Sequence, residues 1–361
     1  MSYIKSIEID ISEAINHYFG SRFSECSQVV SKIFNKDPNL LIPNYLYSLL
    51  LYRSGNKIEA LDLMRKIDRA FPALKKFNYR HSVLEQQKDD DWQTVQSKRL
   101  KEFWTFQFIQ NFIISYPKCG RTWLRLLLGK YLLNGSEGDP IEILNITNGR
   151  PELPTTEFSH DDYPMWKHID FINKDKSIYQ NKKVIFLIRD PRDVLVSYYF
   201  QYTKRKDREI ANDNFDGTMG DFLHHPIGGL PSIINFYNIW AENLTTPESL
   251  MILTYEELHN TPFESLKETI NFLGFPDYGE KTMLDAIEYC QFENMKEIEE
   301  KNLLNNQRLR ADNLSDPETF KVRKGKIGGY KDYLSNSEII NLEDYINSNL
   351  HPFYKQFKYI K

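Results

Sequence analysis

A short polar turn, Lys118-Cys119-Gly120-Arg121-Thr122, lies between the apolar run Ile113-Ile114 and the leucine-rich stretch Leu124–Leu128. This order of apolar run, turn and leucine-rich stretch predicts a buried strand, a tight loop and a helix. The turn then places two cations, a glycine and a hydroxyl at the N-terminus of the helix, where free N–H groups and the helix dipole favour an anion. These residue types in this place predict binding of a phosphate-like group.

The turn is not a Walker A loop, whose pattern is G-x-x-x-x-G-K-[ST]. No glycine opens it, and Lys118 precedes Gly120 by two positions. We therefore do not expect it to hold the β- and γ-phosphates of ATP with a magnesium ion. A P-loop kinase stays open as an alternative function, but it requires the Walker A lysine and an apolar strand that ends in a magnesium-binding aspartate. Here the candidate strand ends in Arg189 before Asp190.

Two further basic patterns follow along the chain. The apolar run Val184–Ile188 is typical of a buried parallel strand, and Arg189 stands at its carboxyl end, before a helical pattern over 194–200. Ser197 lies one to two turns into that helix, so two anion donors are expected at the edge where open α/β sheets bind ligands. Much later, Arg323-Lys324-Gly325-Lys326 interleaves glycine with cations, as in a loop that wraps a phosphate.

Together these segments resemble the three cofactor-binding segments of the soluble, cytosolic-type sulfotransferases, in the order of that family. The matching motifs are Tyr-Pro-Lys-x-Gly-x-Thr-Trp at 116–123, Arg-Asp-Pro-Arg-Asp-Val-x-Val-Ser-Tyr-Tyr at 189–199 and Arg-Lys-Gly at 323–325. The resemblance covers about Asn111 to the C-terminus. It implies transfer of a sulfuryl group from 3′-phosphoadenosine 5′-phosphosulfate (PAPS) to an acceptor hydroxyl or amine, with 3′-phosphoadenosine 5′-phosphate (PAP) as product and no metal.

The resemblance also implies roles for individual positions. It makes 118–122 the cradle of the 5′-phosphosulfate and Trp123 a stacking partner for adenine, with Tyr255 and Phe292 as further contacts to the base. The positions to which it assigns cofactor contacts are Lys118, Cys119, Gly120, Arg121, Thr122, Trp123, Arg189, Ser197, Tyr255, Cys290, Phe292, Arg323, Lys324 and Gly325. Cys119 stands where a serine is usual and Arg121 where a threonine is usual, which leaves the side-chain hydrogen bonds there open.

A histidine between the two phosphate segments is the candidate general base. His160 matches the family position best, and His168 is its competitor. The match is incomplete, since the family often carries a lysine two residues before the histidine and this chain has Phe158. An unperturbed imidazole has a pKa of about 6.5 and accepts a proton at neutral pH. The implied mechanism is in-line transfer, in which His160 takes the acceptor's proton while Lys118 stabilises charge on the departing oxygen.

We expect two domains. Residues 106–361 are predicted to form the sulfotransferase domain, an α/β fold with a P-loop-like parallel sheet flanked by helices. Residues 1–105 are helical in period and are predicted to form a small all-α, tetratricopeptide-like domain. At 361 residues, with 41% hydrophobic residues, the chain is long enough for two cores.

The tetratricopeptide prediction depends on the spacing of small residues. Laying 41–72 on the 34-residue template puts Ser48 and Ala60 where helices must approach, and Ala14 and Cys26 precede them by one repeat length. Two repeats are fewer than the three that usually stand alone. We therefore expect them to rest on a further helix over Trp92–Phe106 and on the catalytic domain.

Composition limits the partners and the compartment. A formal net charge of −4 argues against general nucleic-acid binding, so the cations of the three segments are local. There is no run of 18 apolar residues, and the first ten residues contain no apolar signal region. With only three cysteines, Cys26, Cys119 and Cys290, these features favour a cytoplasmic protein without a transmembrane segment. Their wide separation also agrees with the absence of a metal.

The acceptor stays open at this point. A hydroxyl-bearing small molecule, a lipid, a sugar or a protein-borne group all fit, and the loops 134–175, 204–229 and 301–320 are expected to surround it. The helical repeats suggest a possible protein partner. A further alternative is an inactive or weakly active PAP-binding adaptor, which would be favoured if His160 pointed away from the phosphate cradle.

Overall fold

The computed structural model describes residues 2–71, 74, 77, 92–134, 146, 150, 152–205, 211, 213, 215–304, 309–310 and 313–357, with side chains from residue 6 onward. The chain divides into two compact units, Met1–Phe108 and Ile109–Lys361. Parts of the three predicted acceptor loops, including residues 135–145, 206–210 and 305–308, lie outside the described residues, as does Pro72 of the repeat template.

The first unit consists of helices where it is described. They are α1 (Ser2–Phe19), α2 (Phe23–Phe34), α3 (Leu41–Arg53), α4 (Lys57–Ala70) and α6 (Trp92–Phe108). Helix α1 packs on α2, and α3 packs on α4. The small residues Ala14, Cys26, Ser48 and Ala60 are all fully buried. The Ser48 hydroxyl donates to the carbonyl of Ala60 at 2.9 Å, so these two helices approach closely where the spacing of small residues predicted.

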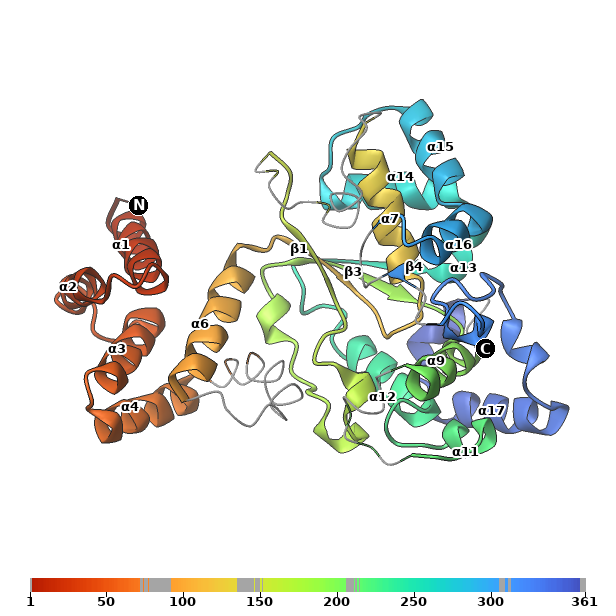
Figure 1. The fold of residues 1–361 in the computed structure, drawn as a ribbon, viewed down its shortest axis with the longest axis horizontal. Coiled ribbons are helices and arrows are strands. Elements are labelled where there is room, and N and C mark those ends of the chain that lie inside the picture. The colour runs from red at the N-terminus through yellow and green to blue at the C-terminus, as the bar shows by residue number, and fades with distance from the viewer. Residues whose placement is uncertain are drawn as a thin grey trace. The chain divides into compact units, whose positions relative to one another are not determined.

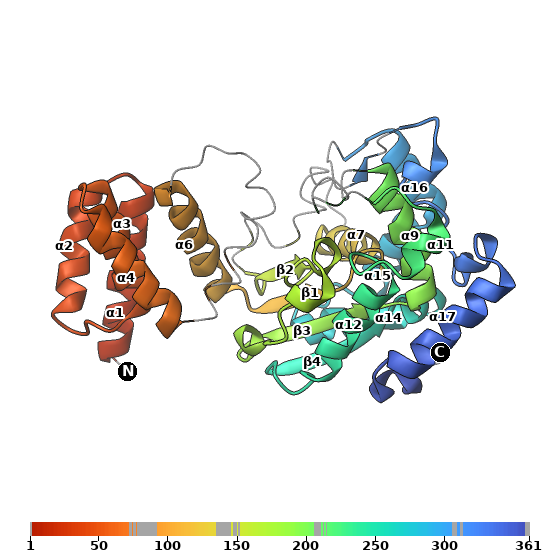
Figure 2. The same ribbon diagram turned by 90° about the horizontal axis from the view of Figure 1, so that it is seen from below.

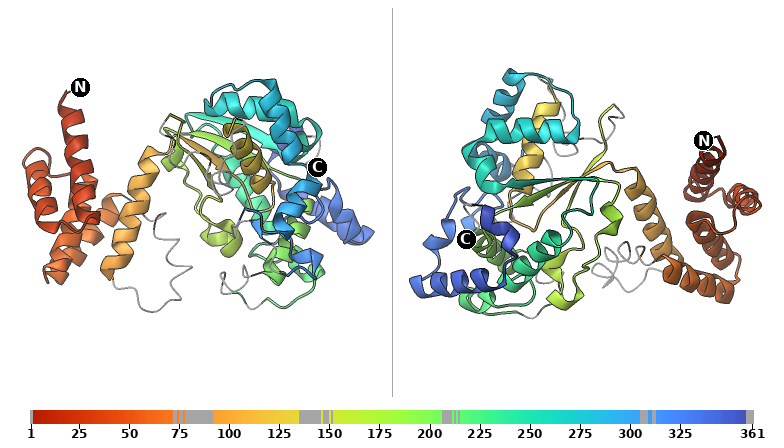
Figure 3. Two further views of the ribbon diagram at one scale, coloured as in Figure 1. Left: turned by 45° about the horizontal axis from the view of Figure 1, so that its top comes forward. Right: turned by 180° about the vertical axis from the view of Figure 1, so that it is seen from behind.

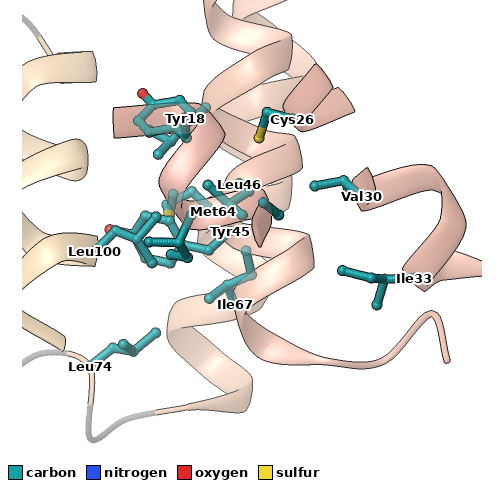
Figure 4. Close-up of a cluster of buried hydrophobic side chains, with 13 residues drawn as sticks. Tyr18, Cys26, Val30, Ile33, Tyr45, Leu46, Met64, Ile67, Leu74 and Leu100 are labelled. Atoms are coloured by element: carbon teal, nitrogen blue, oxygen red, sulfur yellow. The ribbon is translucent and has the colours of Figure 1, made fainter. Parts of the chain in front are cut away.

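Helix α6 belongs to the core of the first unit. Its Leu100 joins a buried cluster with residues of the four preceding helices, among them Tyr18, Tyr45 and Met64 (Figures 2 and 4). Polar contacts add to this packing, because the fully buried Arg99 donates to the Asp68 carboxylate at 2.6 Å. The helix predicted over 92–106 is therefore present, and it extends two residues further.

The second unit is built on a parallel sheet of four described strands. These are β1 (Asn111–Ile114), β2 (Thr156–Ser159), β3 (Lys183–Ile188) and β4 (Ser249–Thr254). Their order in the sheet is β2-β1-β3-β4, and all pairs are parallel, with Ile114 beside both Ser159 and Phe186. The apolar runs that predicted strands at 113–114 and 184–188 fall in β1 and β3, the two central strands. Continuous apolar sequence follows from burial on both faces.

Helices cover both faces of this sheet. The α-helices that the structure describes in the second unit are α7 (Arg121–Leu132), α9 (Pro191–Lys204), α11 (Met219–Leu223), α12 (Leu230–Ala241), α13 (Tyr255–Asn260), α14 (Pro262–Leu273), α15 (Glu280–Tyr289), α16 (Phe292–Glu300) and α17 (Asn336–Asn349). Helices α7 and α14 lie on one side and α12 on the other (Figures 1 and 3). Trp240 of α12 stacks on Phe186 of β3 with ring centroids 5.2 Å apart. The predicted α/β class with an all-α N-terminal region is confirmed.

The strand order creates a switch point in the sheet. Strand β1 lies between β2 and β3, so the chain leaves β1 toward one edge and leaves β3 toward the other. Open α/β sheets bind their ligands in the crevice that such a reversal opens at the carboxyl ends of the strands. The fold therefore places the turn after β1 and the turn after β3 side by side at this crevice.

A strained turn follows β2. Asp161, Asp162 and Tyr163 all have positive φ, at 40°, 68° and 50°, a conformation that costs energy in residues other than glycine. Buried partners hold it in place. The Asp161 carboxylate accepts hydrogen bonds from Tyr179 at 2.9 Å and Trp240 at 3.2 Å and pairs with the ammonium of the fully buried Lys176 at 2.5 Å. This network fixes the direction in which the chain leaves β2.

Among the described residues, no helix is both long and apolar enough to cross a membrane. All three cysteines are buried, and none forms a disulfide.

Candidate functional site

Each of the four strands carries a cavity-lining residue at or just beyond its carboxyl end. Lys118 lies in the turn after β1, and His160, Arg189 and Tyr255 directly follow β2, β3 and β4. All four line one cavity of about 440 Å³. Parallel strands bring their carboxyl ends to the same edge of the sheet, which explains how residues so distant in sequence meet.

Most of the predicted site residues line this cavity. Those that do are Lys118, Gly120, Arg121, Thr122, Trp123, His160, Arg189, Ser197, Tyr255, Cys290, Phe292, Arg323, Lys324 and Gly325. Two do not. Cys119 points elsewhere, and the competitor His168 is 41% exposed and pairs with Asp170 at 3.1 Å. Of the two candidate bases, the cavity contains His160.

The cavity also contains residues that sequence reasoning missed, among them Gln201 and Lys321. Lys326, part of the predicted phosphate loop, lines it as well. Gln201 lies one helical turn after Ser197 on α9, and the i, i+4 spacing was the signal that could have found it. Lys321 stands two residues before Arg323, and its closeness to the basic pattern was the signal that could have found it.

The turn after β1 has a backbone that requires glycine at one position. Gly120 has φ of +92°, and a Cβ there would lie 2.7 Å from Cδ2 of Tyr255. Both the conformation and the ring exclude a side chain. Lys118 also has positive φ, at 70°, a strained conformation for a lysine that is typical of functional turns. The ring of Tyr255 therefore lies directly on the predicted phosphate cradle.

Cys119 faces the protein core instead of the cavity. Its thiol is fully buried and lies 3.5 Å from the hydroxyl of Tyr237 on α12. Burial raises the pKa of the thiol to about 12, so it carries no charge at neutral pH. This orientation excludes Cys119 as a nucleophile and corrects any expectation of a side-chain contact there. A contact from Cys119 to the 5′-phosphosulfate would therefore come from its backbone N–H.

Arg189 joins the first basic segment to the third. Its guanidinium donates to the carbonyl of Lys118 at 3.2 Å and to that of Lys326 at 2.9 Å, and it lies 4.0 Å from the ring centroid of Tyr255. It also lies 3.4 Å from Asp193. The ion pair with Asp193 is thus only part of the environment of Arg189. Arg189 is almost fully buried, at 9% exposure, in a position to hold an anion between the two segments.

Two buried carboxylates shape residues 321–330, which we call the third segment. Asp193 of α9 accepts the backbone N–H groups of Gly328 at 2.8 Å and Tyr330 at 2.9 Å. Glu299 of α16 accepts those of Lys321 at 2.7 Å and Val322 at 2.8 Å. Because these carboxylates bind backbone N–H groups, they fix the loop without neutralising its lysine and arginine side chains.

Phe292 packs against the third segment as Tyr255 packs against the first. Gly325 has φ of +59°, and a Cβ there would clash with the ring of Phe292. Lys324 and Lys326 both donate to the Asp332 carboxylate, at 3.0 and 2.9 Å, and Arg323 donates to Glu318 and to the hydroxyl of Tyr333. The cations of this segment are thus held by acidic partners at the rim of the cavity.

His160 is held in one tautomer. Its Nδ1–H donates to the carbonyl of Ser115 at 2.9 Å, which leaves Nε2 as the acceptor. Nε2 accepts a hydrogen bond from the guanidinium of Arg121 at 2.5 Å. Burial and the Arg121 charge hold the pKa of His160 well below its ordinary value. The imidazole is therefore neutral at physiological pH, the state that a general base needs.

Cations dominate the cavity. Of the described residues that line it, seven are lysine or arginine, and Asp193 carries the one carboxylate. Burial, together with the nearby charges of Lys321 and Arg205, lowers the pKa of Lys118 to about 7. Such an environment disfavours the ammonium until an anion arrives.

A parallel α/β sheet with a basic cavity at its switch point, lined by both a neutral histidine and a lysine, points to a transferase that takes its donor as a phosphate-like anion. Comparison with known families agrees. The model of the sulfotransferase domain family matches residues 109–354, most of the second unit, and the chain belongs to this family. The protein transfers a sulfuryl group from PAPS to an acceptor, which confirms the predicted enzyme class and cofactor. The alternative of a P-loop kinase is thereby rejected.

Individual relatives are distant. The chain is 25% identical to cytosolic sulfotransferase 12 of Arabidopsis thaliana over 62% of this chain and 72% of that protein. It is 24% identical to flavonol 3-sulfotransferase of Flaveria bidentis over 66% of this chain and 81% of that protein. Among solved structures, mouse sulfotransferase SULT7A1 complexed with PAP aligns with a TM-score of 0.46 and 20% identity, covering 67% of this chain and 85% of that one.

The part of the chain that the structure describes contains no group of three or more histidine, cysteine, aspartate or glutamate residues that could hold a metal ion.

The low pKa of Lys118 predicts a pH dependence of cofactor binding. A bound phosphate favours the ammonium, so binding near neutral pH should take up a proton, and affinity for PAP should fall as pH rises through about 7. Calorimetry in buffers of different ionisation enthalpy measures this uptake.

Lys118→Arg is the matched control, because arginine stays charged throughout this range. The variant keeps the titration of the phosphates of PAP themselves, which occurs near pH 6. Wild-type affinity should therefore fall more steeply than that of the variant between about pH 6.5 and about pH 8.5. Equal pH profiles for the two proteins would contradict the assignment.

Proposed function

We propose that the cavity binds PAPS with its 5′-phosphosulfate on the turn after β1 and its 3′-phosphate between Arg189, Ser197 and the third segment. One observation carries this proposal. The three basic segments and His160 line a single cavity, although they lie far apart in sequence. The position of Arg189, whose guanidinium bridges carbonyls of the first and third segments, supports it further.

The adenine is proposed to lie among aromatic side chains. Trp123 and Tyr255 are neighbours, with ring centroids 5.7 Å apart, and both line the cavity with Phe292. Since Tyr255 packs on Gly120 and Phe292 packs on Gly325, the two rings stand beside the two proposed phosphate sites. Aromatic faces at this spacing suit a purine, which gains from stacking.

The general base is proposed to be His160. Its Nδ1–H is engaged by the Ser115 carbonyl, so Nε2 faces the acceptor hydroxyl and receives its proton, and the same carbonyl stabilises the imidazolium that forms. Lys118 donates to the oxygen that leaves with the 5′-phosphate and stabilises its developing charge. PAPS supplies the sulfuryl group, and the residues of this chain supply orientation and electrostatic stabilisation.

The position of His160 in the cavity argues against the inactive adaptor, which would be favoured by a histidine turned away.

For the acceptor, we propose a small molecule with a hydroxyl group. Relatives with the names flavonol 3-sulfotransferase and flavonol 4′-sulfotransferase support this class. Close to the base in sequence, Tyr163 and Trp166 stack with ring centroids 5.1 Å apart and offer aromatic surface. Lipid, sugar and protein-borne hydroxyls are the competing classes.

Helices α1 to α4 are proposed to be two tetratricopeptide-like repeats that bind a protein partner. Their 34-residue offset supports the repeat assignment, since α2 begins at Phe23 and α4 at Lys57. The complete burial of Ala14, Cys26, Ser48 and Ala60 supports it as well. We also propose a cytoplasmic location, which the names of the cytosolic relatives and the three unpaired cysteines support.

Selectivity among nucleotides tests the proposed cofactor site. Because separate basic segments meet the two ends of a 3′,5′-bisphosphorylated adenosine, PAP should bind far better than AMP or ATP, without magnesium. Arg189→Ala should weaken PAP binding by about 1.5–3 kcal/mol, the contribution of a charge-assisted hydrogen bond. Calorimetry measures these affinities. Equal affinity for AMP and PAP would overturn the 3′-phosphate site.

Turnover of the histidine variants tests the base. His160→Ala should keep PAP affinity and lower the rate of sulfuryl transfer to a phenol or alcohol acceptor by about 10²–10⁴-fold, the usual contribution of general-base catalysis. The matched control is His168→Ala, whose side chain lies outside the cavity and whose rate should stay near that of the wild type. Loss of transfer in the control and its retention in His160→Ala would assign the base to His168.

A further inference from the structure

Two departures from the family pattern meet at the catalytic histidine. Arg121 replaces the usual threonine at the first position of α7, and Phe158 replaces a frequent lysine on β2. Arg121 and Arg125 are four residues apart on the helix, and Phe158 and His160 are two apart on the strand, so each pair shares a face. Arg121 contacts His160 at 2.5 Å, and the Arg125 guanidinium lies 4.3 Å from the ring centroid of Phe158.

The contact at His160 locates Arg121 at the reacting atoms. Nε2 is the only ring nitrogen that can take a proton, because Nδ1 already donates to Ser115. The acceptor oxygen must come within about 2.6–3.2 Å of Nε2 to be deprotonated, and within about 3–3.5 Å of sulfur to attack it. A guanidinium that touches Nε2 therefore lies within reach of the sulfuryl oxygens.

In the free protein, the hydrogen bond from Arg121 competes with the acceptor's proton for Nε2 of His160. The lone pair of Nε2 accepts from Arg121, so it is engaged and cannot receive the acceptor's proton at the same time. The guanidinium must therefore leave Nε2 before transfer. The sulfuryl group is negatively charged, carries several oxygens and is proposed to lie next to Lys118, three residues earlier in the same turn, so it offers the guanidinium an acceptor there.

We propose that Arg121 is a further catalytic residue, whose guanidinium turns from Nε2 of His160 to the sulfuryl oxygens when PAPS binds. The proposal rests on the function proposed above. One movement then has two effects, since it exposes the lone pair of the base and neutralises the group in transit. The acceptor oxygen forms its bond to sulfur, its proton goes to Nε2, and the breaking S–O bond leaves its electron pair on the 5′-phosphate of PAP.

The residue type suits this role. A guanidinium stays charged at every physiological pH and presents paired N–H donors that match two oxygens of one anion, which a threonine hydroxyl cannot do. This chain has Phe158 where the family often has a lysine, and Arg121 is the cation that contacts its histidine.

A comparison of PAPS with PAP isolates the contact, because PAP lacks the sulfuryl group. Calorimetry without acceptor would measure both affinities for the wild type, Arg121→Met and Arg121→Thr. We expect the two variants to bind PAP within about threefold of the wild type and PAPS about tenfold to a hundredfold more weakly. Arg121→Lys, which keeps the charge, should retain part of the PAPS affinity. Thermal melting verifies that each variant is folded.

A second readout uses the free protein. NMR titration of His160 should give a pKa nearer the ordinary imidazole value in Arg121→Met, because the neighbouring charge is gone. Lys130→Met is the matched control, since Lys130 lies on the same helix against Tyr289 and does not line the cavity. It should leave this pKa and both affinities unchanged.

The outcomes separate the proposals. Equal weakening of PAP and PAPS in Arg121→Met and Arg121→Thr would make Arg121 a structural residue and overturn the inference. Unchanged PAPS affinity with a raised Michaelis constant for the acceptor would assign the guanidinium to the acceptor and also overturn it. A wild-type chain that binds neither nucleotide would overturn the proposed cofactor site, and this inference with it.

Discussion

Repulsion among cations in one partly buried cavity is the constraint on which the site depends. Lys118, Arg121 and Arg189 line one cavity with the lysines and arginine of the third segment, and Asp193 carries the one carboxylate among the described lining residues. Like charges brought out of water oppose folding unless something holds the backbone around them. Here Asp193 and Glu299 bind backbone N–H groups of the third segment, so the loop is fixed while its cations keep their charge for an anion.

The free protein satisfies these cations with parts of itself. Arg189 donates to two backbone carbonyls, Asp332 pairs with Lys324 and Lys326, and His160 accepts from Arg121. The carbonyls and the imidazole carry no net charge, unlike a phosphate or sulfuryl group, and the Asp332 side chain is 34% exposed. In the proposed function, binding of PAPS is an exchange of partners within a preformed cavity, and the strained turn held by Asp161 directly follows His160.

Much of the fold and of the candidate site could be predicted from the sequence, because local sequence patterns indicate them. Apolar runs predicted β1 and β3 because both strands are buried on two faces, and Arg189 was found from its place at a strand end. Other features depend on contacts between distant segments. Cys119 is turned inward by Tyr237 of α12, and the pairing of Arg121 with His160 requires the register of α7 against β2, which no local pattern contains. Lys321 escaped notice because it stands outside the family motif.

Hydrogen–deuterium exchange on addition of PAP tests the central claim most directly, namely that one ligand holds three distant segments. Peptides over 116–123, 189–201 and 321–330 should all gain protection with PAP, because its two ends engage all of them. AMP, which lacks the 3′-phosphate, should protect the first segment and leave the third exchanging as in the free protein. Protection confined to one segment in the presence of saturating PAP would contradict the account.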